Sequence, residues 1–160
     1  MNKNSTTQIF KLLRTGSHED FIRLATSNVN ATSDSNRSLL HEAIAYGKKD
    51  SALTLIKLGA ELNAKDILGR TPLHYAAMFN QLDTVNALIN AGSDANEVDK
   101  YGNNPLWTAV LTPNINREII RALMLARSDC YSINKSGRSA IDMAVAIGDK
   151  DILSIMEGGQ

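Results

Sequence analysis

The sequence predicts an all-α solenoid, a stack of helix-turn-helix units, and three observations lead to this fold class. First, residues 38–43 return as residues 71–76 and again as residues 104–109, each time after 33 residues. Second, the apolar pair at residues 55–56 recurs at residues 88–89 with the same offset. Third, 160 residues with 43% hydrophobic content can close one core. Self-similarity near 33 residues is typical of a solenoid built from a turn and two helices.

The first element is an N-terminal cap unit, expected over residues 1–32. It keeps only the apolar rhythm of a repeat, which is carried by Ile9, Leu12, Leu13, Phe21 and Leu24. A terminal unit buries one face against its neighbour and shows the other to water, so its sequence is expected to diverge. Lys11 and Arg14 interrupt the apolar residues, so this segment has no signal-peptide stretch.

Three central repeats follow, expected over residues 33–65, 66–98 and 99–133. In the second of them, Thr71 is predicted to cap a helix whose first position is Pro72, where a missing N–H costs no intrahelical bond. The small side chains of Ala76 and Ala77 let adjacent helices approach closely. The inward stripe of the second helix is predicted to consist of Val85, Leu88 and Ile89.

The third repeat is longer than the other two, and a C-terminal cap unit follows it. Aligned on Gly102 and Gly137, this repeat runs 35 residues, which places two extra residues between its helices. Pro113 should end the first of these helices early, so an enlarged inter-helix loop is predicted over residues 112–117. The cap is expected over residues 134–160, which completes a single domain of about five units.

The repeated positions resemble the ankyrin-repeat family. They are Asp66, Gly69, Thr71, Pro72, Leu73, His74, Ala76, Ala77, Val85, Leu88, Ile89, Ala91, Gly92 and Asn96. The resemblance is strong over residues 33–134 and weaker in the two flanks. It implies an ankyrin-repeat solenoid whose units are joined by short β-hairpin loops, and it implies a function in binding another protein.

Composition excludes several classes of function. The 17 basic and 17 acidic residues cancel, so the chain lacks the global positive field that attracts nucleic acid or anionic membrane. No segment reaches the roughly 18 apolar residues that a membrane-spanning helix requires. Cys130 is the one cysteine, which excludes an intramolecular disulfide and favours a reducing, cytoplasmic location. Neither nucleic acid nor membrane is expected as a partner.

The residues that could carry chemistry favour a protein without catalytic, metal or cofactor sites. His41 and His74 occupy the same repeat position, and the family resemblance implies that their imidazoles hydrogen-bond turn backbone. A metal pair is the alternative, but no Cys, Asp or Glu recurs beside them with ligand spacing. No phosphate-binding glycine motif is present. An enzyme that uses Cys130 or His18 remains a distant alternative.

The family resemblance also implies where a partner binds: on the hairpin tips and the exposed end of each first helix, which line a concave groove. Transferred position by position, the partner-binding residues are predicted to be Arg37, Tyr46, Ile67, Leu68, Arg70, Met78, Phe79, Lys100, Tyr101, Asn103, Leu111, Thr112 and Arg138. These positions ordinarily face solvent.

Two features of this surface indicate how it binds. Ile67, Leu68, Met78 and Phe79 form an apolar cluster, which marks a candidate interaction patch unless these side chains cover one another or the register is shifted by one residue. A basic rim is expected along the hairpin tips. It comprises Arg37, Arg70, Lys100, Lys135 and Arg138 and would suit an acidic partner, although a solvated solenoid edge gives the same pattern.

A binding surface without an appended module favours a stoichiometric inhibitor or immunity protein, which neutralises a partner such as a toxin or enzyme. The alternative is an adaptor or scaffold whose two faces bind different proteins. In the absence of its partner the chain is expected to be a monomer.

Overall fold

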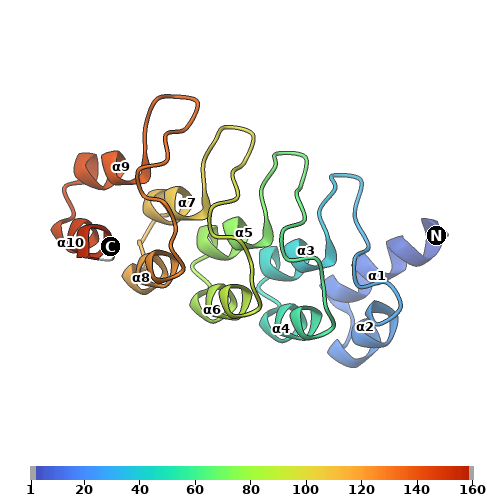
Figure 1. The fold of residues 1–160 in the computed structure, drawn as a ribbon. Coiled ribbons are helices and arrows are strands. Elements are labelled where there is room, and N and C mark those ends of the chain that lie inside the picture. The colour runs from blue at the N-terminus through green and yellow to red at the C-terminus, as the bar shows by residue number, and fades with distance from the viewer. Residues whose placement is uncertain (1–2, 159–160) are drawn as a thin grey trace.

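The computed structural model describes residues 3–158 and shows a row of paired helices (Figure 1). The helices are α1 (Lys3–Thr15), α2 (His18–Ala25), α3 (Leu39–Ala45), α4 (Lys49–Lys57), α5 (Pro72–Met78), α6 (Leu82–Asn90), α7 (Pro105–Leu111), α8 (Arg117–Leu125), α9 (Ala140–Ile147) and α10 (Lys150–Gly158). The first helix of each pair lies in one row and the second helix in another (Figure 1). This arrangement confirms the all-α solenoid. Within residues 3–158 no helix has the length and apolar character needed to cross a bilayer.

Long loops leave the stack before α3, α5, α7 and α9 and turn back at their tips (Figure 1). Each is closed at its tip by backbone hydrogen bonds, among them those from the N–H groups of Ser33, Asp66, Asp99 and Asn134 to the carbonyl oxygens of Arg37, Arg70, Asn103 and Arg138 at 2.9–3.0 Å. Across residues 3–158 the β-pairing is limited to an isolated bridge between Thr32 and Ser38. The loops are therefore hairpin-shaped, but they lack the strands that the word β-hairpin implies.

The first helices begin where the sequence predicts. Thr71 is the N-cap of α5 and Pro72 is its first residue. The backbone N–H of Thr71 donates to His74 Nδ1 at 3.1 Å. A side chain in the first turn of α5 therefore provides a hydrogen-bond acceptor for the N–H group of the N-cap residue. In α7 the N-cap is Asn104, whose Oδ1 accepts a hydrogen bond from the Trp107 N–H in the first turn at 2.9 Å.

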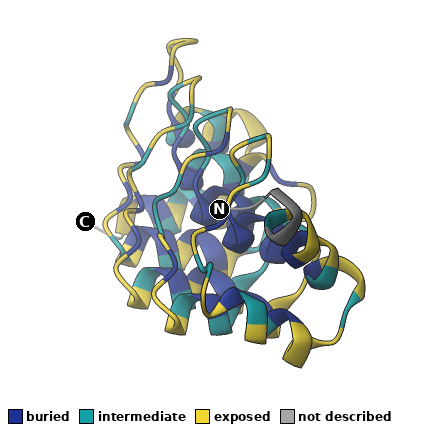
Figure 2. Ribbon diagram, turned by 90° about the vertical axis from the view of Figure 1, so that its right-hand side faces the viewer, coloured by how far each residue is buried: buried dark blue, intermediate teal, exposed yellow. Residues whose placement is uncertain are grey.

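The core runs along the whole stack between the two rows of helices (Figure 2). Ala76 and Ala77 are completely buried where α5 packs against α3 and α7. In α6, Val85 and Leu88 are completely buried and Ile89 is half-buried. The predicted small-residue contacts and the inward stripe are thus both confirmed.

The loop between α7 and α8 is longer than its equivalents, as predicted. Helix α7 ends at Leu111 and α8 begins at Arg117, whereas residues 46–48 and 79–81 are enough to join the helices of the two preceding units. The side chain of Asn80, in the preceding inter-helix loop, donates to the carbonyl oxygens of Pro113 and Asn114, both at 3.2 Å. One inter-helix loop therefore supports the next.

The last unit differs from the expectation that its outer face would suit water. Val145 aligns with Ala77 and Val110, which are completely buried because another unit covers them, yet Val145 is 62% exposed. Tyr131, in the unit before the last, aligns with Asn96, whose Oδ1 accepts a hydrogen bond from the N–H of Asp129 in the unit that follows Asn96, at 2.7 Å. Tyr131 is exposed. The stack thus ends on apolar side chains at positions that contact the next unit elsewhere.

Candidate functional site

The four hairpin tips and the ends of the first helices are the positions at which partner contacts are predicted, and they are called the hairpin face below. Its tip segments are residues 34–37, 67–70, 100–103 and 135–138, and its helix ends are residues 45–46, 78–79, 111–112 and 146–147. Neighbouring tips are joined by backbone hydrogen bonds. The N–H groups of Ile67, Lys100 and Lys135 donate to the carbonyl oxygens of Ser35, Leu68 and Tyr101 at 3.2, 2.9 and 2.9 Å. The tips therefore have a fixed spacing.

Glycine makes this close approach of the tips possible. Gly69 has φ +75°, and a Cβ at this position would meet the backbone nitrogen of Lys100 at 3.0 Å. Gly102 has φ +83°, and its Cβ would meet Asn134 Cα at 3.1 Å. Any larger residue would be strained in its own conformation and would push the next hairpin away.

Apolar side chains are exposed along the hairpin face. Ile67 is 66% exposed and Phe79 is 46% exposed, while Leu68 and Met78 are half-buried. The exposed side chains of Tyr46, Tyr101 and Leu111 extend the apolar surface on either side. Because Ile67 and Phe79 keep about half or more of their surface in contact with solvent, mutual coverage does not account for the cluster.

Phe79 rests on a buried aromatic residue that the sequence reading did not single out. Its ring lies 6.1 Å from that of Tyr75, and the Tyr75 ring lies 5.0 Å from the imidazole of His41. The Tyr75 hydroxyl donates to Asp66 Oδ2 at 2.9 Å. The exposed Phe79 ring therefore packs on a buried, hydrogen-bonded tyrosine. In the sequence, the indication of this contact was the aromatic residue directly after His74.

Arg70 is predicted to contact a partner, but its guanidinium forms an ion pair with a carboxylate of the same chain. Its Nε and Nη2 donate to Asp66 Oδ2 at 3.0 and 2.8 Å, and Nη2 also donates to the Tyr75 hydroxyl at 3.0 Å. Burial acts to raise the pKa of Asp66, but the hydrogen bonds from Arg70 outweigh it, and the pKa lies below its ordinary value. The guanidinium thus neutralises a buried charge within the protein.

Arg37 is held in the same way by Glu42, another residue that sequence reading missed. Its Nη2 lies 2.8 Å from Glu42 Oε1, and the Glu42 side chain is only 1% exposed. Neither carboxylate oxygen makes a well-oriented hydrogen bond within the described chain, so the pair is held mainly by charge. Arg37 and Arg70 lie at the hairpin face, but their positive charges are already compensated.

Two further predicted residues have structural contacts. Thr112 was expected to face solvent, and this expectation is wrong: Thr112 is 8% exposed, and its hydroxyl donates to the Thr108 carbonyl oxygen at 2.8 Å. The chain turns away from the helix at this residue before Pro113, which draws the side chain inward. Asn103 is half-buried, and its Oδ1 accepts a hydrogen bond from Asn134 Nδ2 at 2.8 Å.

The histidines of the repeated motif connect one unit to the next, which confirms their structural assignment. His41 Nε2 lies 3.0 Å from the Arg70 carbonyl oxygen, and His74 Nε2 lies 2.9 Å from that of Asn103. Since the Ser38 N–H donates to His41 Nδ1, the ring is neutral with its proton on Nε2. Burial lowers the pKa of His41 to about 4 and also lowers that of His74.

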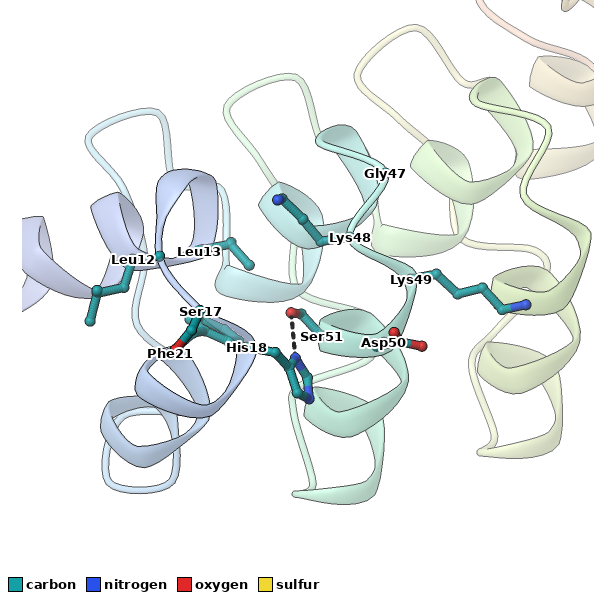
Figure 3. Close-up of a pocket in the computed structure, with 11 residues that line it drawn as sticks. Leu12, Leu13, Ser17, His18, Phe21, Gly47, Lys48, Lys49, Asp50 and Ser51 are labelled. Atoms are coloured by element: carbon teal, nitrogen blue, oxygen red, sulfur yellow. Dashed lines mark hydrogen bonds between the residues drawn. The ribbon is translucent and has the colours of Figure 1, made fainter.

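A hollow beside His18 holds the arrangement closest to a catalytic pair (Figure 3). His18 Nδ1 lies 3.1 Å from Ser51 Oγ, a distance at which an imidazole can accept a serine proton. In the described part of the chain, no carboxylate hydrogen-bonds the His18 ring to orient it as a base. We interpret the contact as a link between α2 and α4.

Cys130 and the acidic residues add no chemical site. Cys130 is buried, and burial raises the pKa of its thiol, so the reactive thiolate is disfavoured. Among the residues that the structure describes, no group of three or more His, Cys, Asp or Glu side chains could hold a metal ion.

Two models of known protein families match the chain. One is described as "Ankyrin repeats (many copies)" and matches residues 40–89. The other is described as "Ankyrin repeats (3 copies)" and matches residues 65–134. The two matches together extend over residues 40–134, more than half of the sequence. A comparison with curated proteins finds no match.

Proposed function

The chain belongs to the ankyrin-repeat family, whose members are typically non-enzymatic modules for protein–protein interaction, and from this premise we propose that it binds a partner protein through the hairpin face and thereby inhibits or neutralises it. The partner is a toxin or an enzyme whose active surface is occluded. The immunity-protein role is the more specific form of this proposal.

The observation that carries the proposal is the exposure of large apolar side chains on a rigid frame. Burying each of Ile67, Phe79 and Tyr101 would contribute on the order of 1.5–3 kcal/mol. Association itself costs roughly 4–15 kcal/mol, so the cluster can anchor a complex but needs additional contacts for tight binding. Because Tyr75 and the tip-to-tip hydrogen bonds hold these residues in place, little further ordering is needed on binding.

A role as inhibitor is supported by how the described residues are used. Helix pairs and their loops take up residues 3–158, so the surface of the repeat stack is what they offer a partner. A rigid surface of this kind can cover an active site without chemistry of its own. We further propose five units, over residues 1–32, 33–65, 66–98, 99–133 and 134–160, in a chain that is monomeric without its partner. The buried, unpaired thiol of Cys130 supports a cytoplasmic location.

The test is affinity capture from the native cell with the wild-type chain and with the variant Ile67→Ala/Phe79→Ala. Ile67 is preferred to Leu68 because Leu68 is half-buried and its replacement would disturb the loop. The variant should bind the captured partner about thirty-fold more weakly, equivalent to roughly 2 kcal/mol for the loss of central anchors. Its unfolding midpoint should match that of the wild type.

The matched control is Leu125→Ala, which removes an exposed apolar side chain from the last residue of α8, in the row of second helices. It should leave partner affinity unchanged. Equal binding by wild type and Ile67→Ala/Phe79→Ala would reject the hairpin face as the site. Toxicity of the captured partner when it is produced alone, relieved by coexpression of this chain, is the expected result for an immunity protein.

One observation favours an adaptor as a second candidate function. Val145 and Tyr131 are further exposed apolar side chains, and they lie in later units than Ile67 and Phe79. A scaffold with two partners would use both sets of side chains. Simultaneous binding of two captured proteins, one lost with Phe79→Ala and the other with Val145→Lys, would support this alternative.

A further inference from the structure

We propose that the tips of the last two hairpins select an acidic segment of the partner protein. This inference rests on the proposed function, because it concerns the chemistry of the partner bound at the same hairpin face. It assigns the selecting role to Lys100, Lys135 and Arg138.

These three side chains differ from the other cations of the tips. All three are exposed, and in the described structure none lies within 4.0 Å of a carboxylate oxygen as an ion pair. Arg37 and Arg70, in contrast, compensate the buried Glu42 and Asp66. Uncompensated positive charge on the tips is therefore concentrated in the fourth and fifth units.

Two carboxylates lie near these cations, and both are engaged elsewhere. Asp99 Oδ1 accepts hydrogen bonds from the backbone N–H groups of Tyr101 and Asn103 at 2.8 and 2.9 Å, so this carboxylate faces its own turn. Asp142 accepts hydrogen bonds from the Ser139 hydroxyl and N–H at 2.6 and 2.8 Å. These bonds are the main cause of its lowered pKa, to which the charge of Arg138 adds. A positive field thus remains at the tips.

The basic tips are held in a fixed relation to the apolar cluster. The backbone bond from the Lys135 N–H to the Tyr101 carbonyl oxygen, 2.9 Å long, ties the last tip to its neighbour. Lys100 Nζ lies 5.2 Å from the centre of the Tyr101 ring, which is itself exposed. From the third unit to the fifth, the hairpin tips therefore pass from apolar at Ile67, through Tyr101, to basic at Lys135 and Arg138.

A partner segment complementary to this order carries apolar or aromatic side chains at one end and Asp or Glu side chains at the other. The carboxylates would pair with Lys100, Lys135 and Arg138, while the apolar end covers Ile67 and Phe79. Complementary charge at such a rim chiefly accelerates encounter and excludes wrong partners. Acidity of the bound segment is thus the property that these residues control.

The experiment is selection from a displayed library of random linear peptides on three immobilised proteins. They are the wild type, the variant Lys100→Glu/Lys135→Glu/Arg138→Glu, and the matched control Lys57→Glu/Arg121→Glu/Lys150→Glu. The control makes the same change in net charge on the exposed surface of the second helices α4, α8 and α10. Thermal unfolding of all three proteins shows that they are folded.

The wild type and the control should both enrich peptides with acidic residues beside apolar ones. The tip variant should lose the acidic excess, and peptides selected on the wild type should associate with it about tenfold or more slowly. Enriched peptides without acidic excess, or with the same excess on the tip variant, would overturn the inference and leave protein binding intact. Failure of the proposed function has a different signature, namely peptides whose binding ignores Ile67→Ala/Phe79→Ala.

Nucleic acid is the competing occupant of a basic surface, and a labelled single-stranded DNA oligonucleotide tests it. The acidic-segment inference expects no binding of this probe at physiological ionic strength. Binding that is retained by the control and lost in the tip variant would overturn the acidic-segment inference, because the same three cations would then bind phosphates.

Discussion

At the scale of single residues, the buried histidines are among the side chains that connect neighbouring units. His41 and His74 each join the start of a first helix to the loop of the following unit. In the third repeat, Trp107 takes the histidine position, and Asn104 Nδ2 donates to the Asp129 carbonyl oxygen of the same unit at 2.9 Å. A neutral imidazole is required for this connection, since Nδ1 accepts and Nε2 donates.

This requirement predicts that stability falls as the pH is lowered from about 6.5 to about 4. Burial holds the pKa of His41 near 4, against an ordinary value of 6.5, so within that window the unfolded chain binds the proton and the folded chain does not. The free energy of unfolding is then largest above pH 6.5. The loss attributable to His41 is roughly 3 kcal/mol across the window, and denaturant unfolding at a series of pH values measures it.

The variant His41→Gln serves as the control for this prediction. It keeps a neutral polar side chain but cannot titrate, so its unfolding free energy should be lower at neutral pH and should depend less on pH. An identical pH dependence in wild type and variant would show that His41 is not the titrating group. The pKa of the ring itself can be followed by NMR titration of its carbon-bound protons.

Some residue roles were predictable from the sequence and others were not. The repetition of His41 at His74 indicated a shared structural task, because a side chain that recurs with the period of the fold meets the same backbone in each unit. The pairing of Arg37 with Glu42 and the inward turn of Thr112 carry no such signal. They depend on which neighbour happens to face them once the chain is folded.

At the scale of elements, the loop between α7 and α8 shows which features of a loop the local sequence can predict. The two additional residues and Pro113 predicted a longer loop, and α7 indeed ends at Leu111. The support from Asn80 was not predictable, since it depends on the stacking of two loops. Similarly, hairpin-shaped turns were expected before each first helix, whereas β-pairing in the described residues is limited to the isolated bridge between Thr32 and Ser38.

Replacing Asn80 with glycine should loosen this loop without straining the backbone. Asn80 has φ +53°, a conformation that glycine adopts at no steric cost, while the two hydrogen bonds to the Pro113 and Asn114 carbonyl oxygens are lost. The expected destabilisation is about 1 kcal/mol. Amide hydrogen exchange should become faster over residues 112–116.

The control for this substitution is Asn114→Gly. Asn114 has φ +56° and lies in the same loop, but its side chain makes no hydrogen bond with the described residues. Its replacement should leave both stability and exchange close to those of the wild type. Equal effects of the two substitutions would mean that asparagine acts through its backbone preference rather than through the contact between loops.

At the scale of the whole molecule, stability is a sum over units and the interfaces between neighbours. Each internal helix pair contacts the pair before it and the pair after it, whereas the first and the last described pairs each contact one neighbouring pair. Equivalent positions in two units can therefore hold the same residue type and still contribute very differently to the free energy of unfolding. Val110 and Val145 occupy equivalent positions and are 0% and 62% exposed.

This difference predicts unequal costs for the same substitution. Val110→Ala should lower the free energy of unfolding by about 2 kcal/mol, because the next unit covers the side chain and a cavity remains. Val145→Ala should change it by no more than about 0.5 kcal/mol, as for other exposed residues. Parallel denaturant titrations of the two variants measure both values, and a comparable loss at Val145 would place that side chain in the core.

The backbone hydrogen bonds between neighbouring tips also bear on how such a protein can acquire new partners over evolution. Main-chain atoms set the spacing of the tips, and the glycines at 69 and 102 preserve it. The side chains of Ile67, Lys100 and Tyr101 take no part in these backbone hydrogen bonds. Descendants of this sequence can therefore exchange those residues, one tip at a time, and change what they recognise while inheriting the same frame.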